Sequence, residues 1–312
     1  MGTSIVGFGK RHYTYADGKP AELCKVGFAR RARSFAVYLP KYPEHAQLFV
    51  RGLRNGVDNM NLELKDKNCI VVGGSRGIGR SIAIGLASEG ANVAICARQE
   101  SALRATEGKL VDQGVKAYAA PCDIADPDAL LRFLRDSRNA LGDIDVLVHN
   151  ASALAVGPDL EDWNSSIKVD LMAAVHACDE VIPWMIETGG GTILLVSSNS
   201  GLECDPSPDY GYTAAKAALI AYAKKLAVMH ATKGIRANAI APGSIDFPGG
   251  FWEGIKREQP KVYDSVRSAI PSGRFGTPEE VADVAVFLCS PRSFWVSGEC
   301  VSVDGAQHRG MR

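Results

Sequence analysis

Short apolar runs alternate with longer segments of helical periodicity along most of the chain. The short runs are nearly continuous in hydrophobicity and rich in β-branched residues, as is typical of strands buried on both faces. They predict strands at residues 68–73, 92–97, 115–120, 144–149, 192–197, 235–240 and 299–303. The intervening segments predict helices at residues 78–89, 100–113, 127–141, 161–187, 212–230 and 278–289. This alternation predicts an α/β fold, a doubly wound parallel seven-stranded sheet with helices on both faces.

A change of composition separates the first 60 residues from the rest. Residues 1–60 hold ten Lys/Arg against four Asp/Glu and four of the nine tyrosines, which would suit RNA but is more typical of a solvated surface. We predict an amino-terminal extension over 1–60 and a single domain over 61–312, with the boundary in a turn-rich stretch. Short strand-like runs at 6–15, 26–31 and 35–39 resemble part of a small bacterial domain called YdhG-like, which implies a truncated remnant.

The composition of the whole chain excludes several classes of protein. Its 312 residues carry 35 basic and 35 acidic side chains, a balance that argues against a dedicated nucleic-acid or membrane-surface binder. No apolar stretch approaches the ~18 residues of a membrane span. Eight cysteines occur without a C-x-x-C pair, and the six histidines lack metal-ligand spacing. We therefore expect a cytoplasmic protein with reduced thiols and no metal.

The first predicted strand leads directly into a glycine-rich turn at residues 73–79. Glycines at this place allow a tight turn and let the backbone approach a pyrophosphate at the amino end of the next helix. A simple turn would also use glycine, but the position between a strand and a helix favours dinucleotide binding. The residues that we predict to hold a cofactor here are Gly73, Ser75, Arg76, Gly77, Ile78 and Gly79.

Further motifs follow this turn in a fixed order. They are Asp123, Asn150-Ala151, Ser198, Tyr212-x-x-x-Lys216, Ala241-Pro242-Gly243, the stretch 271–282 and Val303-Asp304-Gly305. Their order and spacing resemble those of the short-chain dehydrogenase/reductase family over about residues 62–312, and most closely its 3-oxoacyl reductase-type members. The resemblance implies a Rossmann fold, a nicotinamide cofactor, a small-molecule carbonyl or alcohol substrate, and homo-oligomers such as dimers or tetramers.

Tyr212 and Lys216 lie four residues apart on one predicted helix, so their side chains share a face. A nearby ammonium favours the phenolate, which lets Tyr212 exchange a proton with a carbonyl oxygen near neutral pH. Ser198, at the end of the fifth strand, would hydrogen-bond the same oxygen. A tyrosine and a lysine at this spacing also occur as an ordinary surface pair, but the upstream serine favours catalysis. Ser197 and Tyr210 are neighbours that do not fit the pattern.

One catalytic position departs from the family. Where the family has a helical asparagine, this chain has Asp170. We interpret it as a near-isosteric catalytic residue that keeps a water-mediated link to Lys216. Its charge would stabilise the ammonium and partly cancel the effect of that ammonium on Tyr212. His149 and Ser152 likewise replace an asparagine and a glycine of the family pattern.

Two arginines favour NADP(H) over NAD(H). Enzymes that use NAD usually place an acid after the second strand to bind the ribose diol, whereas this chain has Ala97 and then Arg98. Together with Arg76, Arg98 would suit a phosphate dianion, although Glu100 remains within reach of a diol. The resemblance assigns the rest of the cofactor to Asp123 and Ile124 (adenine), Asn150 and Ala151 (adenine ribose), and Pro242, Gly243, Ile245, Tyr212 and Lys216 (nicotinamide end).

The substrate would be enclosed by a mobile lid predicted over residues 244–253. Its apolar walls would be Phe247, Phe251 and Trp252 on one side and Ala153, Leu154 and Leu202 on the other. The two longest predicted helices carry small residues that the family uses between subunits, although tight packing on the sheet would also explain them: Ala173, Ala174, Ala217, Ala218 and Ala221.

The sequence therefore predicts an NADP(H)-dependent oxidoreductase that reduces a ketone or 3-oxoacyl group to a secondary alcohol. The alternative is a catalytically idle nucleotide-binding protein that uses the same fold for regulation or assembly.

Overall fold

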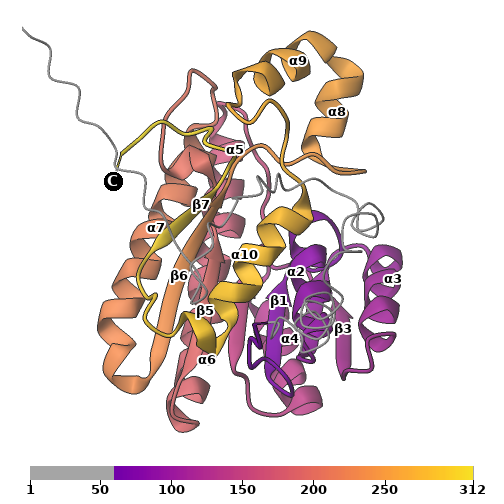
Figure 1. Ribbon diagram of the computed structural model, residues 1–312, viewed down its shortest axis with the longest axis vertical. Coiled ribbons are helices and arrows are strands. Elements are labelled where there is room, and N and C mark those ends of the chain that lie inside the picture. Colours follow the sequence, from indigo (N-terminus) through magenta and orange to yellow (C-terminus); the bar gives the residue numbers. More distant parts are fainter. Residues whose placement is uncertain (1–59, 312) are drawn as a thin grey trace, which may run out of the picture. The chain divides into compact units, whose positions relative to one another are not determined.

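The computed structural model describes residues 60–311, so residues 1–59 of the extension, with the YdhG-like runs, lie outside the described residues. Within 60–311, seven parallel strands form one sheet in the order β3-β2-β1-β4-β5-β6-β7, with helices on both faces (Figure 1). The strands are β1 (Asn68–Val72), β2 (Asn92–Ala97), β3 (Ala117–Pro121), β4 (Val146–His149), β5 (Gly191–Val196), β6 (Ile235–Pro242) and β7 (Cys300–Val303). The predicted doubly wound fold is confirmed, and the strand ends differ from the predicted ones by at most two residues.

Alternate residues of each strand face two separate cores. Ile70 and Val72 of β1 belong to one apolar cluster, whereas Cys69 and Val71 belong to the other, as the two-residue repeat of a strand requires. The helices over the first cluster are α4 (Pro127–Leu141), α6 (Ala173–Glu187) and α7 (Tyr210–His230). Those over the second are α2 (Gly77–Ser88), α3 (Glu100–Val111) and α10 (Pro278–Cys289).

The strand order reverses next to β1. From β1 the chain builds outward through β2 and β3, and then returns to place β4 on the other side of β1. The connections after β1 and β4 therefore leave the sheet in opposite directions, which opens a crevice beyond their carboxyl ends.

The helix predicted over 161–187 is continuous but changes its winding. It consists of α5 (Leu160–Ser165), a π-helical segment η2 (Ser166–Met172), and α6. A π-helix bonds residue i to i+5, so it turns a different set of side chains inward than the predicted α-helical pattern does. Asp170 is fully buried, whereas the apolar side chains of Ile167 and Leu171 on the same segment are only half-buried.

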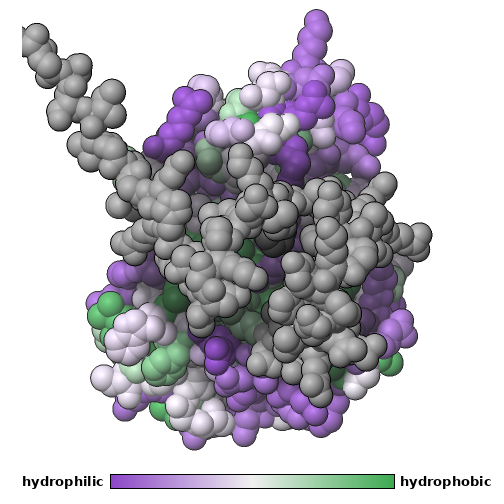
Figure 2. Space-filling view, viewed as in Figure 1, coloured by the Kyte–Doolittle hydropathy of each residue, from purple (hydrophilic) through white to green (hydrophobic). Residues whose placement is uncertain are grey.

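Two further helices occupy the region after β6. They are α8 (Phe251–Glu258) and α9 (Pro260–Ala269), where the sequence had predicted only a lid over 244–253. Hydrophilic side chains dominate the outer surface over these helices (Figure 2), whereas Trp252, Ile255, Tyr263 and Val266 lie in an apolar cluster on their inner side. Tyr263 of α9 donates a hydrogen bond to Asp246 Oδ2 at 2.7 Å and packs on Phe275, so α9 is anchored to the start of the predicted lid.

Membrane-spanning helices, metal-ligand clusters and cysteines can be assessed over residues 60–311. Among residues 60–311, no helix is long and apolar enough to cross a bilayer, and no group of three or more His, Cys, Asp or Glu is arranged to hold a metal. Five buried cysteines in this range are free thiols: Cys69, Cys96, Cys122, Cys178 and Cys289.

Candidate active site

A cavity of about 1570 Å³ opens beyond the carboxyl ends of the strands, at the crevice next to β1. Most of the predicted site residues border it: Gly73, Ser75, Arg76, Ile78, Arg98, Asp123, Ile124, Asn150, Ala151, Ser198, Tyr212, Lys216, Pro242, Gly243 and Ile245. Gly77, Gly79 and Asp170 do not border it, and neither does Leu202, which was expected to line the substrate side. Ala153, Leu154 and the three aromatic residues of the predicted lid do border it.

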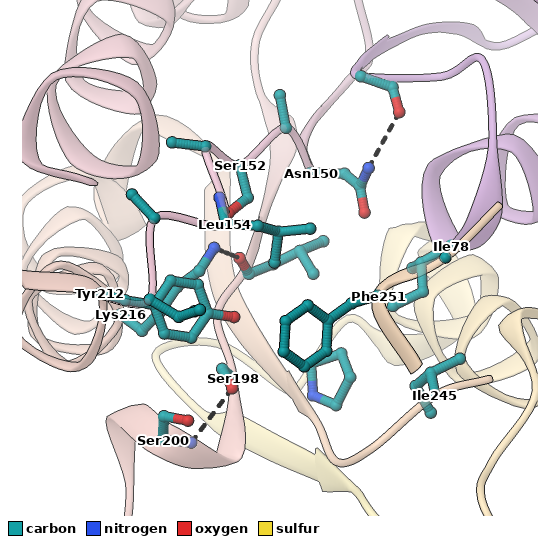
Figure 3. Close-up of a pocket in the computed structure, with 18 of the residues that line it drawn as sticks. Ile78, Asn150, Ser152, Leu154, Ser198, Ser200, Tyr212, Lys216, Ile245 and Phe251 are labelled. Atoms are coloured by element: carbon teal, nitrogen blue, oxygen red, sulfur yellow. Dashed lines mark hydrogen bonds between the residues drawn. The ribbon is translucent and has the colours of Figure 1, made fainter. Parts of the chain in front are cut away.

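Lys216 is held in a fixed position by groups on several elements. Its side chain is almost fully buried and lies on α7, one turn from Tyr212 (Figure 3). The ammonium donates a hydrogen bond to the Val196 carbonyl oxygen at 3.0 Å, lies 3.1 Å from Asp170 Oδ1, and is 5.5 Å from the centroid of the Tyr212 ring. The predicted shared face of the tyrosine and the lysine is therefore present, and the positive charge is next to the phenol.

Asp170 contacts Lys216 directly, which differs from the expected water-mediated link. The π-helical winding of η2 turns its carboxylate into the interior, and Ala153 N–H donates to its other oxygen, Oδ2, at 3.0 Å. Because Asp170 does not border the cavity, it reaches a substrate only through Lys216.

The two adjacent serines have different surroundings. Ser198 borders the cavity, accepts a hydrogen bond from Ser200 N–H at 3.1 Å and donates to Asn199 Oδ1 at 3.2 Å. Ser197 also borders the cavity, but it donates its hydroxyl proton to the Lys216 carbonyl oxygen at 2.7 Å. Ser197 therefore supports the helix backbone, while Ser198 is available at the cavity. Tyr210 is 58% exposed and lies outside the cavity wall.

The glycine-rich turn packs closely against its neighbours. Gly73 has a positive φ of 84°, and a Cβ at this position would lie 2.8 Å from Ala151 Cα. Asn150 Nδ2 donates to the Gly73 carbonyl oxygen at 3.0 Å, which ties the end of β4 to the turn (Figure 3). At Gly77 a Cβ would collide with the ring of Phe247. The turn thus needs glycine both for its backbone and for its neighbours.

The glycine-rich turn and the amino end of α2 suit the phosphates of a dinucleotide. Helix α2 begins without a side-chain cap and has no acid in its first turn, so its amino end is suited to an anion. Arg76 and Arg98 border the same cavity. Arg76 Nη1 donates to the Gly249 carbonyl oxygen at 3.0 Å, which leaves the other donors of this guanidinium for an anion.

Several residues at the cavity were not found from the sequence. Gln307 accepts a hydrogen bond from Ser244 N–H at 2.8 Å and donates to Ser244 Oγ at 3.1 Å, so the carboxyl-terminal segment fixes the turn after β6. Its place two residues beyond the Val303–Gly305 motif was the available signal. Val262 and Val266 border the cavity from α9 and were missed together with that helix.

The alanines expected between subunits fall into two groups. Ala173 and Ala174 are buried in the core of this chain, so tight packing on the sheet explains them and they cannot face a partner. Ala217 and Ala221 of α7 are exposed.

Comparison with known proteins identifies relatives along the described domain. A family model described as enoyl-(acyl carrier protein) reductase matches residues 72–308. Isoepoxydon dehydrogenase of Penicillium expansum is 35% identical over 252 residues, which cover 80% of this chain and 97% of that protein. 3-oxoacyl-(acyl-carrier-protein) reductase of Chlamydia muridarum is 38% identical over 253 residues, which cover 79% of this chain and 99% of that protein.

Solved structures agree with these matches. The structure of 7α-hydroxysteroid dehydrogenase complexed with NADH and 7-oxo glycochenodeoxycholic acid has a TM-score of 0.74 at 30% identity, covering 81% of this chain and 98% of that chain. A variant of actinorhodin polyketide ketoreductase with NADPH has a TM-score of 0.72 at 28% identity, covering 77% and 97%. With its glycine-rich turn, its tyrosine–lysine pair and these matches, the chain belongs to the short-chain dehydrogenase/reductase family of oxidoreductases.

Proposed function

We propose that this protein reduces a ketone or 3-oxoacyl group to a secondary alcohol with NADP(H), and that Tyr212 is the general acid. The observation that carries the proposal is that Ser198, Tyr212 and Lys216 border the same cavity as the glycine-rich turn. A substrate carbonyl and a nicotinamide cofactor would therefore meet at the proton donor.

The residues of the chain would handle the proton and the developing charge. The cofactor supplies the hydride when bound. Tyr212 donates its phenolic proton to the carbonyl oxygen, while Ser198 turns its hydroxyl from Asn199 to hydrogen-bond the same oxygen. The buried Lys216 ammonium favours the negative charge left on Tyr212. Ile245, Phe247 and Phe251 would exclude water from the reacting atoms.

The choice of NADP(H) rests on Arg76 and Arg98. Both border the cavity near the glycine-rich turn, and paired guanidinium groups suit a phosphate dianion. The solved relatives named above are complexed with NADH in one case and with NADPH in the other. They support a nicotinamide cofactor, and the arginines support the phosphorylated form.

The names of the relatives support a small carbonyl or alcohol substrate. They include isoepoxydon dehydrogenase, a 3-oxoacyl reductase and a hydroxysteroid dehydrogenase. We further propose a cytoplasmic homo-oligomer, a dimer or a tetramer, in which residues 1–60 form an extension on a catalytic domain over 61–312.

A panel of ketones and 3-oxoacyl thioesters, assayed by NADPH oxidation, tests the proposed function. NADPH binding is measured in parallel by its fluorescence. Turnover of at least one carbonyl is expected. Tight NADPH binding without turnover of any compound would instead favour the idle nucleotide-binding protein.

A further inference from the structure

Three buried polar atoms lack hydrogen-bond partners in the interior behind Lys216. Among residues 60–311 they are both ring nitrogens of His149 and Oδ1 of Asp170, and Ser297 Oγ is the other atom of this kind in that range. Both residues are fully buried. Asp170 Oδ1 has an ion-pair contact with Lys216 but no hydrogen bond. Polar atoms of this kind are rare in folded proteins and call for an explanation.

The sheet fixes where the His149 ring lies. His149 ends β4 between Val72 of β1 and Leu195 of β5 in register. By the two-residue alternation of a strand it points to the same face as Leu147, which belongs to the cluster beneath α6 and α7. The ring therefore faces the helical layer that carries Asp170 and Lys216.

The electrostatic surroundings keep this ring neutral. Burial, followed by the positive charge of Lys216, lowers the pKa of His149 to about 4, and Asp170 opposes this only in part. A neutral imidazole offers one N–H donor and one acceptor. Asp170 Oδ1 can only accept a hydrogen bond. A small molecule that accepts from the imidazole N–H and donates to Asp170 Oδ1 would therefore satisfy both groups.

We propose that an internal water molecule binds between the His149 ring and Asp170 Oδ1, and that His149 thereby positions the carboxylate against Lys216. The imidazole N–H donates to the water oxygen, and the water donates to Asp170 Oδ1. Internal waters satisfy buried polar groups in this way. Both carboxylate oxygens of Asp170 are then held, Oδ1 by the water and Oδ2 by Ala153 N–H. The carboxylate in turn holds the Lys216 ammonium next to Tyr212.

The water site is tested on the wild-type full chain by a crystal structure at a resolution that shows ordered water. A water within hydrogen-bond distance of one His149 ring nitrogen and of Asp170 Oδ1 is expected. A direct bond between His149 and Asp170, or no density between them, would overturn the proposal. This readout needs no turnover, so it stands even if the proposed function fails.

The positioning role rests on the proposed function and is tested by His149→Phe, His149→Asn and the control Ser297→Ala. His149→Phe keeps a ring but cannot bind the water, so kcat should fall about tenfold while KM for NADPH and for the carbonyl stays within about twofold. His149→Asn keeps a donor and an acceptor and should retain kcat within about threefold. Ser297→Ala removes an unpartnered hydroxyl outside the cavity wall and should leave kcat unchanged.

Equal losses in His149→Phe and His149→Asn, or a wild-type kcat in His149→Phe, would contradict a positioning role. If His149→Phe does not fold, the crystallographic result and His149→Asn still decide the proposal. A wild-type protein that turns over no carbonyl would count against the proposed function and leave the water site to the crystal structure.

Discussion

The buried pair of Asp170 and Lys216 places a compensating negative charge close to Tyr212. The carboxylate lies 3.1 Å from the ammonium in the interior, where charges interact more strongly than in water. Part of the effect of the ammonium on the phenol is thus cancelled.

Individual site residues were predictable where their spacing along the chain fixes their relative positions, as for Tyr212 and Lys216. The direct contact of Asp170 was not, because it depends on the π-helical winding of η2.

Asp170→Asn should move the pH–rate profile of carbonyl reduction to lower pH. Removing the negative charge leaves the ammonium without its compensating partner, so the charge left on Tyr212 after proton donation is stabilised more strongly. The measurement is kcat against pH for the wild type, for this variant and for Asp283→Asn, which changes an exposed acid on α10. Superimposable profiles for all three proteins would mean that the carboxylate does not influence the reacting proton.

Replacing Arg76 and Arg98 together by alanine should weaken NADPH much more than NADH. Only NADPH carries the additional phosphate, so we expect Kd for NADPH to rise at least about tenfold and Kd for NADH less than about threefold. Titration of cofactor fluorescence measures both. Arg76 also holds the Gly249 carbonyl oxygen, so Arg98→Ala alone serves as the variant that leaves this contact intact. Equal losses for the two cofactors would show that the arginines do not recognise the phosphate.

Among the elements, the strands and most helices were predictable within two residues because their apolar periodicity is strong. The departures occur where a helix is short or where its winding changes. Helices α8 and α9 carry apolar residues at helical spacing, Trp252 and Ile255 in α8 and Tyr263 and Val266 in α9. Each helix is at most ten residues long, and Phe251 and Trp252 of α8 were interpreted as part of a lid. The π-helical turn leaves no signal in a 3.6-residue repeat.

The hydrogen bond from Tyr263 to Asp246 should make α9 sensitive to alkaline pH. This bond, reinforced by burial, raises the pKa of Tyr263 to about 12, above the value of 10.0 for a free phenol. A raised pKa contributes stability that is complete below pH 10 and is lost between pH 10 and 12. The unfolding free energy of the wild type, measured with urea, should therefore fall more steeply across this range than that of Tyr263→Phe. Parallel slopes would show that the bond is absent in solution.

As a whole, residues 60–311 form a sheet whose two faces are both covered by helices. The match to isoepoxydon dehydrogenase spans 252 residues, which are 97% of that protein. We expect a chain that begins at Met60 to fold, to bind NADPH and to keep its turnover within a few-fold of the full chain. Melting temperature and turnover of both forms with one ketone provide the check. Aggregation or loss of cofactor binding in the shorter chain would place residues 1–60 within the catalytic domain.

The central claim is that Tyr212 donates the proton, and Tyr212→Phe tests it most directly. Phenylalanine keeps the ring next to Lys216 and removes only the hydroxyl. The matched control is Tyr210→Phe, which removes a hydroxyl from an exposed ring two residues earlier and outside the cavity wall. With NADPH and a ketone that the wild type reduces, kcat/KM should fall at least about a hundredfold in Tyr212→Phe and stay unchanged in Tyr210→Phe. Retained turnover in Tyr212→Phe would contradict the account.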